Sequence, residues 1–438
     1  MMVVLAAVVF LLGLGALATA RDRNALVPAT FFVVLWAGYA LVTVGVFATD
    51  RAVYGPAMLW LVAACAAVVA GSAFAGRVDH PATTRSAPAE LGTLLPGLRP
   101  VTTLLVVACV AHLIWIFARA GFSWRNVASA AVIAQVSSLN RSSFGYGDLE
   151  QGMAERFLFI ADYGGPLFAG LLFRVRRHWL DRGISMLALY LGVLIPTLYG
   201  SRMGVLFGGS FWLAAFMAAH VYIRRPAGAA SARFLFQVAG VAVAVLMGLS
   251  LLAMMVRYRW SFDQGRSFAY LVADPFAFLA AFAYWFREHG LRLHGLLAGF
   301  RDFEHWFAFF GLHVGQARGA LQDWPAIHVG FTSSNIYTLF RFLIEDFGIL
   351  GALLWLFGFG ALSARAFRAV LRGSRLAVAW LAVCYSYVLT SFSMSLLYYV
   401  TVTAGIALFV GYFVALELLD RGPGRRSGLE VPEGGSTT

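Results

Sequence analysis

The feature that most constrains the fold is a series of apolar segments, each close to the length of a membrane-spanning helix. A helix needs about 20 apolar residues to cross the hydrocarbon core of a bilayer. Of the 438 residues, 61% are hydrophobic and only 12% are charged, which excludes a disordered chain and a disulfide scaffold. The predicted spans are residues 2–20, 26–48, 54–75, 101–120, 157–173, 184–200, 203–223, 234–256, 343–363, 376–397 and 400–419. We therefore expect an all-α polytopic membrane protein with about eleven transmembrane helices.

The distribution of arginine predicts the orientation of these spans. All 33 basic residues are arginines, and 19 of them lie in one set of loops together with 7 of the 21 acidic residues. The rest of the chain holds 14 arginines and 14 acidic residues, so this set carries the whole net charge of +12. The set comprises residues 21–25, 76–100, 174–183, 224–233, 364–375 and 420–438. Because arginine accumulates in cytoplasmic loops, we expect an outside N-terminus, an inside C-terminus and no nucleic-acid partner.

The chain divides into two groups of membrane helices separated by one large outer loop. Only two outer connections are long, and the second is the only large element predicted outside the membrane. The predicted parts are an N-terminal transmembrane bundle (1–256, eight spans, with a minor outer loop at 121–156), the large loop (257–342), C-terminal transmembrane helices (343–419) and a disordered cytoplasmic tail (420–438). If the protein carries out chemistry on polar substrates, the large loop is where they can reach it.

The large loop is rich in aromatic residues and is expected to be ordered. Its stretch 268–286 is apolar but contains Pro275, which bends or breaks a helix. We predict a helix lying at the outer interface there, with Tyr284, Trp285 and Phe286 at the level of the lipid headgroups. Residues 291–312 are predicted to form a second, amphipathic helix. The aromatic residues that should pack on the bundle or in the headgroup layer include Phe276, Phe278, Phe282, Trp285 and Trp306.

The short connection Gly200-Ser201-Arg202 is a candidate anion site. It joins the sixth and seventh spans, so Arg202 must lie at the membrane surface at the start of the seventh helix. The free N–H groups and the dipole of a helix N-terminus favour an anion such as phosphate. The alternative is an arginine that reaches into the lipid headgroups and has no ligand.

A second group of arginines follows the eighth span. Arg257, Arg259 and Arg266 emerge where that span leaves the membrane, with Asp263 among them. Guanidinium groups bind phosphate oxygens through paired hydrogen bonds, which are strong at a surface of low dielectric constant. A phosphate site is predicted here as well, against the alternative of headgroup anchoring.

Acidic residues mark the start of the ninth span. Glu345 and Asp346 enter a membrane helix, close to Arg341. Carboxylates are costly in that position unless they are paired or hydrated, so they indicate a site or an ion pair within the membrane. Simple stabilisation of the helix N-terminus is the alternative.

Histidines are concentrated in the large loop, which holds five of the nine: His289, His294, His305, His313 and His328. Histidine is a good general base near neutral pH. Their spacing matches no metal motif, and polar anchoring at the interface is the alternative for each of them.

Three of these features together resemble a known family. The chain has Gly200-Ser201-Arg202 before an apolar helix, and a single large outer loop with a Tyr270-to-Pro275 stretch. The loop closes with a motif that includes Asn335, Tyr337, Asp346, Gly348 and Gly351. Over residues 184–363 this pattern resembles the oligosaccharide repeat-unit polymerases of bacterial envelopes (O-antigen type, Wzy).

The resemblance implies a GT-C-like helical membrane fold and a particular reaction. Such enzymes sit in the bacterial inner membrane and join oligosaccharide repeat units carried on undecaprenyl pyrophosphate, at the periplasmic face. The family implies no nucleotide sugar, metal or other cofactor. The implied partners are the lipid-linked oligosaccharide, membrane lipid and a chain-length regulator.

The polymerase interpretation assigns roles to particular residues but leaves the base open. The expected pyrophosphate ligands are Arg202, Arg257, Arg259, Arg266 and Arg341, and the candidate catalytic bases are His328, His294 and Asp263.

Two alternatives remain. Related O-antigen ligases often carry His-Asn where this chain has Ser334-Asn335, which favours the polymerase. A flippase or transporter of lipid-linked glycans would be expected to show charges within several spans and an internal repeat.

Overall fold

The structure is a computed structural model, and it describes most of the membrane-embedded part of the chain. The described residues are 2–22, 24–46, 51–76, 95–123, 125, 129–145, 153–176, 178–199, 201–225, 230–235, 237–238, 240, 276–290, 327–329, 332–334, 338–397 and 399–420.

Long helices make up almost all of the described chain. They are α1 (Met2–Asp22), α2 (Pro28–Val46), α3 (Arg51–Phe74), α5 (Leu98–Arg119), α7 (Met153–Val175), α8 (Trp179–Leu198), α9 (Arg202–Arg224), α15 (Leu339–Leu371), α16 (Arg375–Thr390) and α17 (Val400–Asp420). Eight of the described helices are long and apolar enough to cross a membrane. The protein is therefore an all-α multi-pass membrane protein. The expected count of about eleven spans stays a prediction, because most of the span expected at 234–256 lies outside the described residues.

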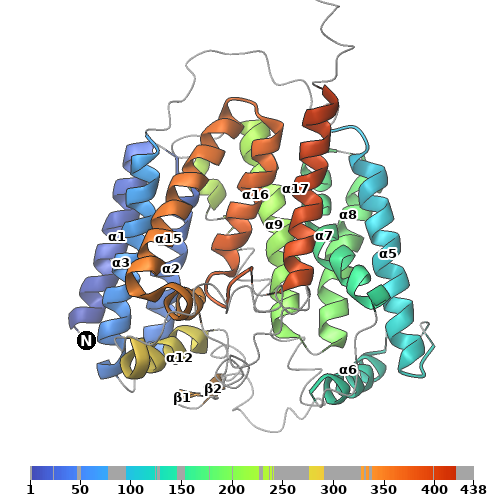
Figure 1. The fold of residues 1–438 in the computed structure, drawn as a ribbon, viewed down its shortest axis with the longest axis horizontal. Helices are drawn as coiled ribbons and strands as arrows, with labels where there is room; N and C mark the ends of the chain where they lie inside the picture. Colours follow the sequence, from blue (N-terminus) through green and yellow to red (C-terminus); the bar gives the residue numbers. More distant parts are fainter. Residues whose placement is uncertain are drawn as a thin grey trace, which may run out of the picture.

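The long helices run side by side, and the two ends of the bundle differ (Figure 1). One end carries α6 (Ala130–Gly145), α12 (Ala277–Trp285) and an antiparallel hairpin of β1 (Ile327–Val329) and β2 (Thr332–Ser334), in which Ile327 pairs with Ser334. We call this the hairpin end. The opposite end carries the tight turn between α15 and α16, with Arg372 and Arg375, and the end of α17 (Figure 1). We call this the arginine-rich end.

Close contact between α3 and α15 depends on glycine. A Cβ atom added at Gly360 of α15 would lie 2.0 Å from the carbonyl oxygen of Val68, and one added at Gly71 of α3 would lie 1.9 Å from that of Phe357. In lipid the hydrophobic effect does not drive helices together, so association depends on such close packing of small residues. These two glycines let the backbones of α3 and α15 touch.

Helix α12 packs on the bundle, as expected for the aromatic residues of the large loop. Trp285 and Phe286 are buried and Tyr284 is half-buried, and Phe286 packs on Trp60 of α3 with ring centroids 6.1 Å apart. Every residue from Ala277 to Ala283 is buried, so this part of the helix is covered on all sides. The expected position of Tyr284, Trp285 and Phe286 at the level of the lipid headgroups stays a prediction.

Three element boundaries also differ from expectation. The minor outer loop contains a helix, α6, and α7 begins at Met153, within that loop. Helix α16 ends at Thr390, whereas the sequence predicted a span to residue 397. Hydroxyl groups explain this end, because Ser391 and Ser393 donate to the carbonyls of Val388 and Thr390 at 2.8 Å and so compete with continued helical bonding.

The glycine contact gives a test of the fold. Gly360→Ala is expected to reduce the free energy of unfolding by about 1–3 kcal/mol, because the new methyl group meets a rigid carbonyl of α3. Gly358→Ala, on the same helix, is the matched control: a Cβ there has nothing within 4 Å. Because alanine favours helix, the control is expected to be neutral or slightly stabilising. The free energy of unfolding of both variants is measured in mixed detergent micelles. Equal stability of the two variants would contradict the close contact between α3 and α15.

Candidate functional site

The turn between α8 and α9 lies at the hairpin end and presents Arg202 as the first residue of a helix. Ser201 is the N-cap: its hydroxyl accepts from the backbone N–H of Gly204 at 3.0 Å. The backbone N–H of Ser201 donates to the carbonyl of Pro196 at 2.9 Å. The predicted helix N-terminus is therefore present, and both sides of the turn are fixed by hydrogen bonds.

Two side chains of α6 form hydrogen bonds with the last carbonyl groups of α8. Ser137 donates to the carbonyl of Thr197 and Asn140 donates to the carbonyl of Leu198, both at 3.0 Å. Ser137 and Asn140 are three residues apart, so they share one face of α6, and both are buried. The last carbonyls of a helix have no partner within the helix. Helix α6 thus acts as an external cap on α8, immediately before the Gly200-Ser201-Arg202 turn.

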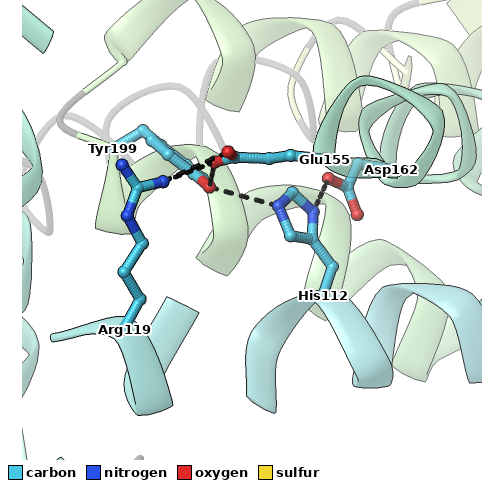
Figure 2. A network of polar contacts seen from close by, with 5 residues as sticks. All are labelled: His112, Arg119, Glu155, Asp162 and Tyr199. Atoms are coloured by element: carbon cyan, nitrogen blue, oxygen red, sulfur yellow. Dashed lines mark hydrogen bonds and ion pairs between the residues drawn. The ribbon is translucent and has the colours of Figure 1, made fainter. Parts of the chain in front are cut away.

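Tyr199, the C-cap of α8, belongs to a chain of polar contacts with α5 and α7 (Figure 2). The Tyr199 hydroxyl donates to the Glu155 carboxylate at 2.5 Å, and Arg119 donates to the same carboxylate at 3.1 Å. On its other side, the Tyr199 oxygen lies 3.2 Å from Nε2 of His112, whose Nδ1 lies 2.6 Å from Oδ2 of Asp162. We call Arg119, Glu155, Tyr199, His112 and Asp162 the polar chain.

The directions of the hydrogen bonds indicate which groups of the polar chain carry a proton. Glu155 receives a guanidinium N–H and the single Tyr199 hydroxyl hydrogen, which is the pattern of an ionised carboxylate. Because that hydrogen is already committed, Nε2 of His112 must donate to the Tyr199 oxygen. The 2.6 Å contact between Nδ1 and Asp162 then holds one further proton, on one partner or the other.

The inner part of the polar chain is sealed from solvent. The side chains of His112 and Asp162 are 0% exposed, and Phe159 packs edge-on against the imidazole with ring centroids 4.8 Å apart. Glu155 is 4% exposed, whereas Arg119 is 26% exposed and Tyr199 is half-buried. Burial, reinforced by the hydrogen bond to Glu155, raises the pKa of the Tyr199 phenol, which is therefore a neutral hydroxyl at physiological pH.

A second polar cluster lies at the start of α15, as predicted from the acidic residues there. Arg341 donates to Glu345 at 2.7 Å and is only 5% exposed. Its guanidinium carbon lies 5.4 Å from the centroid of the Trp285 ring, which joins α15 to α12. The ion pair, one of the alternatives that the sequence left open for Glu345, is present. The expected role of Arg341 as a pyrophosphate ligand stays a prediction.

A glycine interrupts α15 directly after this cluster. Asp346 is fully buried, and two residues later Gly348 has φ 68° and ψ 179°, which breaks the helical path inside α15. The left-handed region of φ favours glycine, because a Cβ would clash with the backbone there. The motif residues Asp346 and Gly348 therefore mark a bend in the helix.

Most other predicted site residues lie outside the described part of the chain. His328 lies on β1 opposite Ser333 of β2, although its side chain is not among those described. The same applies to the side chain of Arg202. The residues outside the described ranges altogether are Gly200, Arg257, Arg259, Asp263, Arg266, His294, Asn335 and Tyr337. The expectation that Arg202 and Arg257 bind the same pyrophosphate therefore stays a prediction.

The polar chain was missed by sequence reasoning, although a signal existed. His112 and Asp162 lie inside the apolar segments 101–120 and 157–173, and an ionisable residue in a membrane span usually has a function or a partner. The sequence analysis did not single out this pair. Among the described residues, no group of three or more His, Cys, Asp or Glu side chains is arranged to hold a metal ion.

Comparison with protein-family models, with curated proteins and with solved structures finds no match to this chain. The function is therefore inferred from the site itself.

The external cap on α8 can be tested with neighbouring serines. Ser137→Ala removes the bond to the Thr197 carbonyl and is expected to cost about 1 kcal/mol locally. Amide hydrogen exchange in residues 197–204 should then accelerate roughly fivefold. Ser138→Ala is the control, because Ser138 is exposed on the next position of α6. Unchanged exchange in both variants would show that α6 does not fix the turn.

Proposed function

We propose that this protein polymerises oligosaccharide repeat units linked to undecaprenyl pyrophosphate, by glycosyl transfer at the periplasmic face of a bacterial inner membrane. The observation that carries the proposal is the fixed turn between α8 and α9. Three successive residues, Thr197 to Tyr199, are held by α6, α5 and α7, and the next helix begins at Arg202.

The location of this turn is consistent with the proposal. It lies at the hairpin end, opposite the turn with Arg372 and Arg375 (Figure 1). If arginine-rich loops face the cytoplasm, as the charge distribution predicts, the hairpin end faces the periplasm. Substrates carried on a polyprenyl lipid arrive within the membrane, and their sugars project from the same face as the turn.

The chemistry of the donor suits a helix N-terminus that begins with arginine. When the sugar leaves its carrier, negative charge grows on the pyrophosphate. Donors that are already oriented toward that charge stabilise the transition state without reorganising. In this proposal the N–H groups at the start of α9 and the guanidinium of Arg202 supply them. Arg257, Arg259 and Arg266 are proposed to complete the site.

Purified protein mixed with lipid-linked repeat units tests the proposal directly. A ladder of products that grows by one repeat unit at a time supports polymerase activity. A single transfer to lipid A would instead indicate a ligase. A protein that binds the lipid-linked unit but forms no covalent product would indicate transport, and the proposal would be wrong.

Arg202 gives a sharper prediction. Arg202→Lys keeps the positive charge but loses the paired hydrogen bonds of guanidinium, so ladder formation should fall by about 100-fold, corresponding to roughly 3 kcal/mol. Arg224→Lys is the matched control, since Arg224 is exposed at the opposite end of the same helix. Ladder intensity is compared at equal protein levels. Ladders of wild-type intensity from both Arg202→Lys and Arg202→Ala would reduce Arg202 to a lipid anchor.

A further inference from the structure

Each glycosyl transfer releases one proton from the acceptor hydroxyl, and a base must take it up. The histidines and the aspartate expected to do so belong to the large loop. The polar chain offers a different acceptor, because it contains an ionised carboxylate next to the Gly200-Ser201-Arg202 turn.

The polar chain has one entrance for a proton. His112 and Asp162 are sealed and Glu155 is 4% exposed, so only Arg119 and Tyr199 reach the surface. Arginine has no acceptor atom and does not deprotonate in proteins. Tyr199 is therefore the one residue of the polar chain that is partly exposed and can also exchange a proton. Tyr199 is also the residue directly before the turn that presents Arg202.

We propose that Tyr199 and Glu155 together form the proton acceptor for the sugar hydroxyl, an inference that rests on the proposed polymerase function. The acceptor oxygen bonds to the anomeric carbon of the donor as the bond from that carbon to the pyrophosphate breaks. The pyrophosphate keeps the electron pair of the broken bond. The acceptor's proton passes to the Tyr199 oxygen, and the proton of Tyr199 passes to Glu155. Glu155 later returns this proton to water through the Tyr199 hydroxyl.

His112 and Asp162 act as positioning residues for Tyr199. The donated Nε2–H of His112 fixes the phenol oxygen at 3.2 Å, and the 2.6 Å contact with Asp162 fixes the imidazole. This keeps the Tyr199 hydroxyl directed at Glu155, across a contact of 2.5 Å that is short enough for proton transfer.

The polar chain ends inside the bundle. Oδ1 of Asp162 is buried and makes no regular hydrogen bond among the described residues, although the Cys109 thiol faces this carboxyl. Within the described residues, no polar contact continues from Asp162 toward the arginine-rich end. This arrangement fits local proton uptake at one face better than proton transport through the membrane.

The charged and titratable groups around the acceptor pair are few. Among the described residues, α5 contributes Arg119 and His112, and α7 contributes Asp162. Helix α6 contributes Ser137 and Asn140, which do not titrate. Tyr199→Phe therefore removes one partner of the Glu155 carboxylate and leaves the other, Arg119, in place.

The test uses the full-length protein with lipid-linked repeat units, and measures the initial rate of ladder formation and the equilibrium binding of one unit. Glu155→Gln and Tyr199→Phe should each lower the rate by at least about 100-fold while binding is retained. Glu155→Asp should recover part of the rate. Tyr412→Phe is the matched control, because among the described residues the Tyr412 hydroxyl bonds a backbone carbonyl, that of Pro96, at 2.8 Å.

The outcomes separate this inference from the proposed function. If the wild type forms a ladder and both Glu155→Gln and Tyr199→Phe match its rate, the acceptor role is wrong and the polymerase proposal stands. If Glu155→Gln fails to fold, Tyr199→Phe decides, because it leaves the Arg119–Glu155 pair intact. A wild type that forms no covalent product overturns both proposals.

Discussion

The structure depends on one constraint: water does not satisfy the polar groups at helix ends that are buried, as those of α8 and α16 are. The protein must supply the partners itself. Helix α6 supplies them for the end of α8 through Ser137 and Asn140, Ser201 supplies one for the start of α9, and serine hydroxyls close the end of α16. The same contacts that satisfy these ends also fix the turn where we place the pyrophosphate.

Buried ionisable side chains need partners even more than buried backbone groups do. A carboxylate or imidazole in apolar surroundings is costly unless it is paired, and removing one partner leaves a buried group with no compensation. Asp162, His112, Tyr199, Glu155 and Arg119 meet this requirement as a continuous series that begins inside the bundle and ends near the surface. Arg341 and Glu345 meet it as a pair on successive turns of α15.

The fold class could be predicted from the sequence because membrane spans are read from length and apolarity alone. The starts of α2, α5, α9 and α17 were predicted to within three residues, and Ser201 and Arg202 were correctly placed at a helix start. The ion pair of Glu345 was also predicted, because a carboxylate in a span needs a partner. Helix α6 was missed because it is not long or apolar enough to cross a membrane. Phe278, Phe282 and Trp285 of α12 were correctly expected to pack on the bundle, but nothing in a single apolar helix reveals which elements cover it.

The sequence by itself determined that this chain crosses the membrane many times and that its charges divide between two faces. These properties follow from local composition, and local composition is sufficient because the bilayer acts on every segment separately. Only the tertiary structure decided that His112 and Asp162, 50 residues apart, share a proton, and that Ser137 caps a helix 60 residues further on. Such contacts form between helices, and which faces of two helices meet is set by close packing that no single segment encodes.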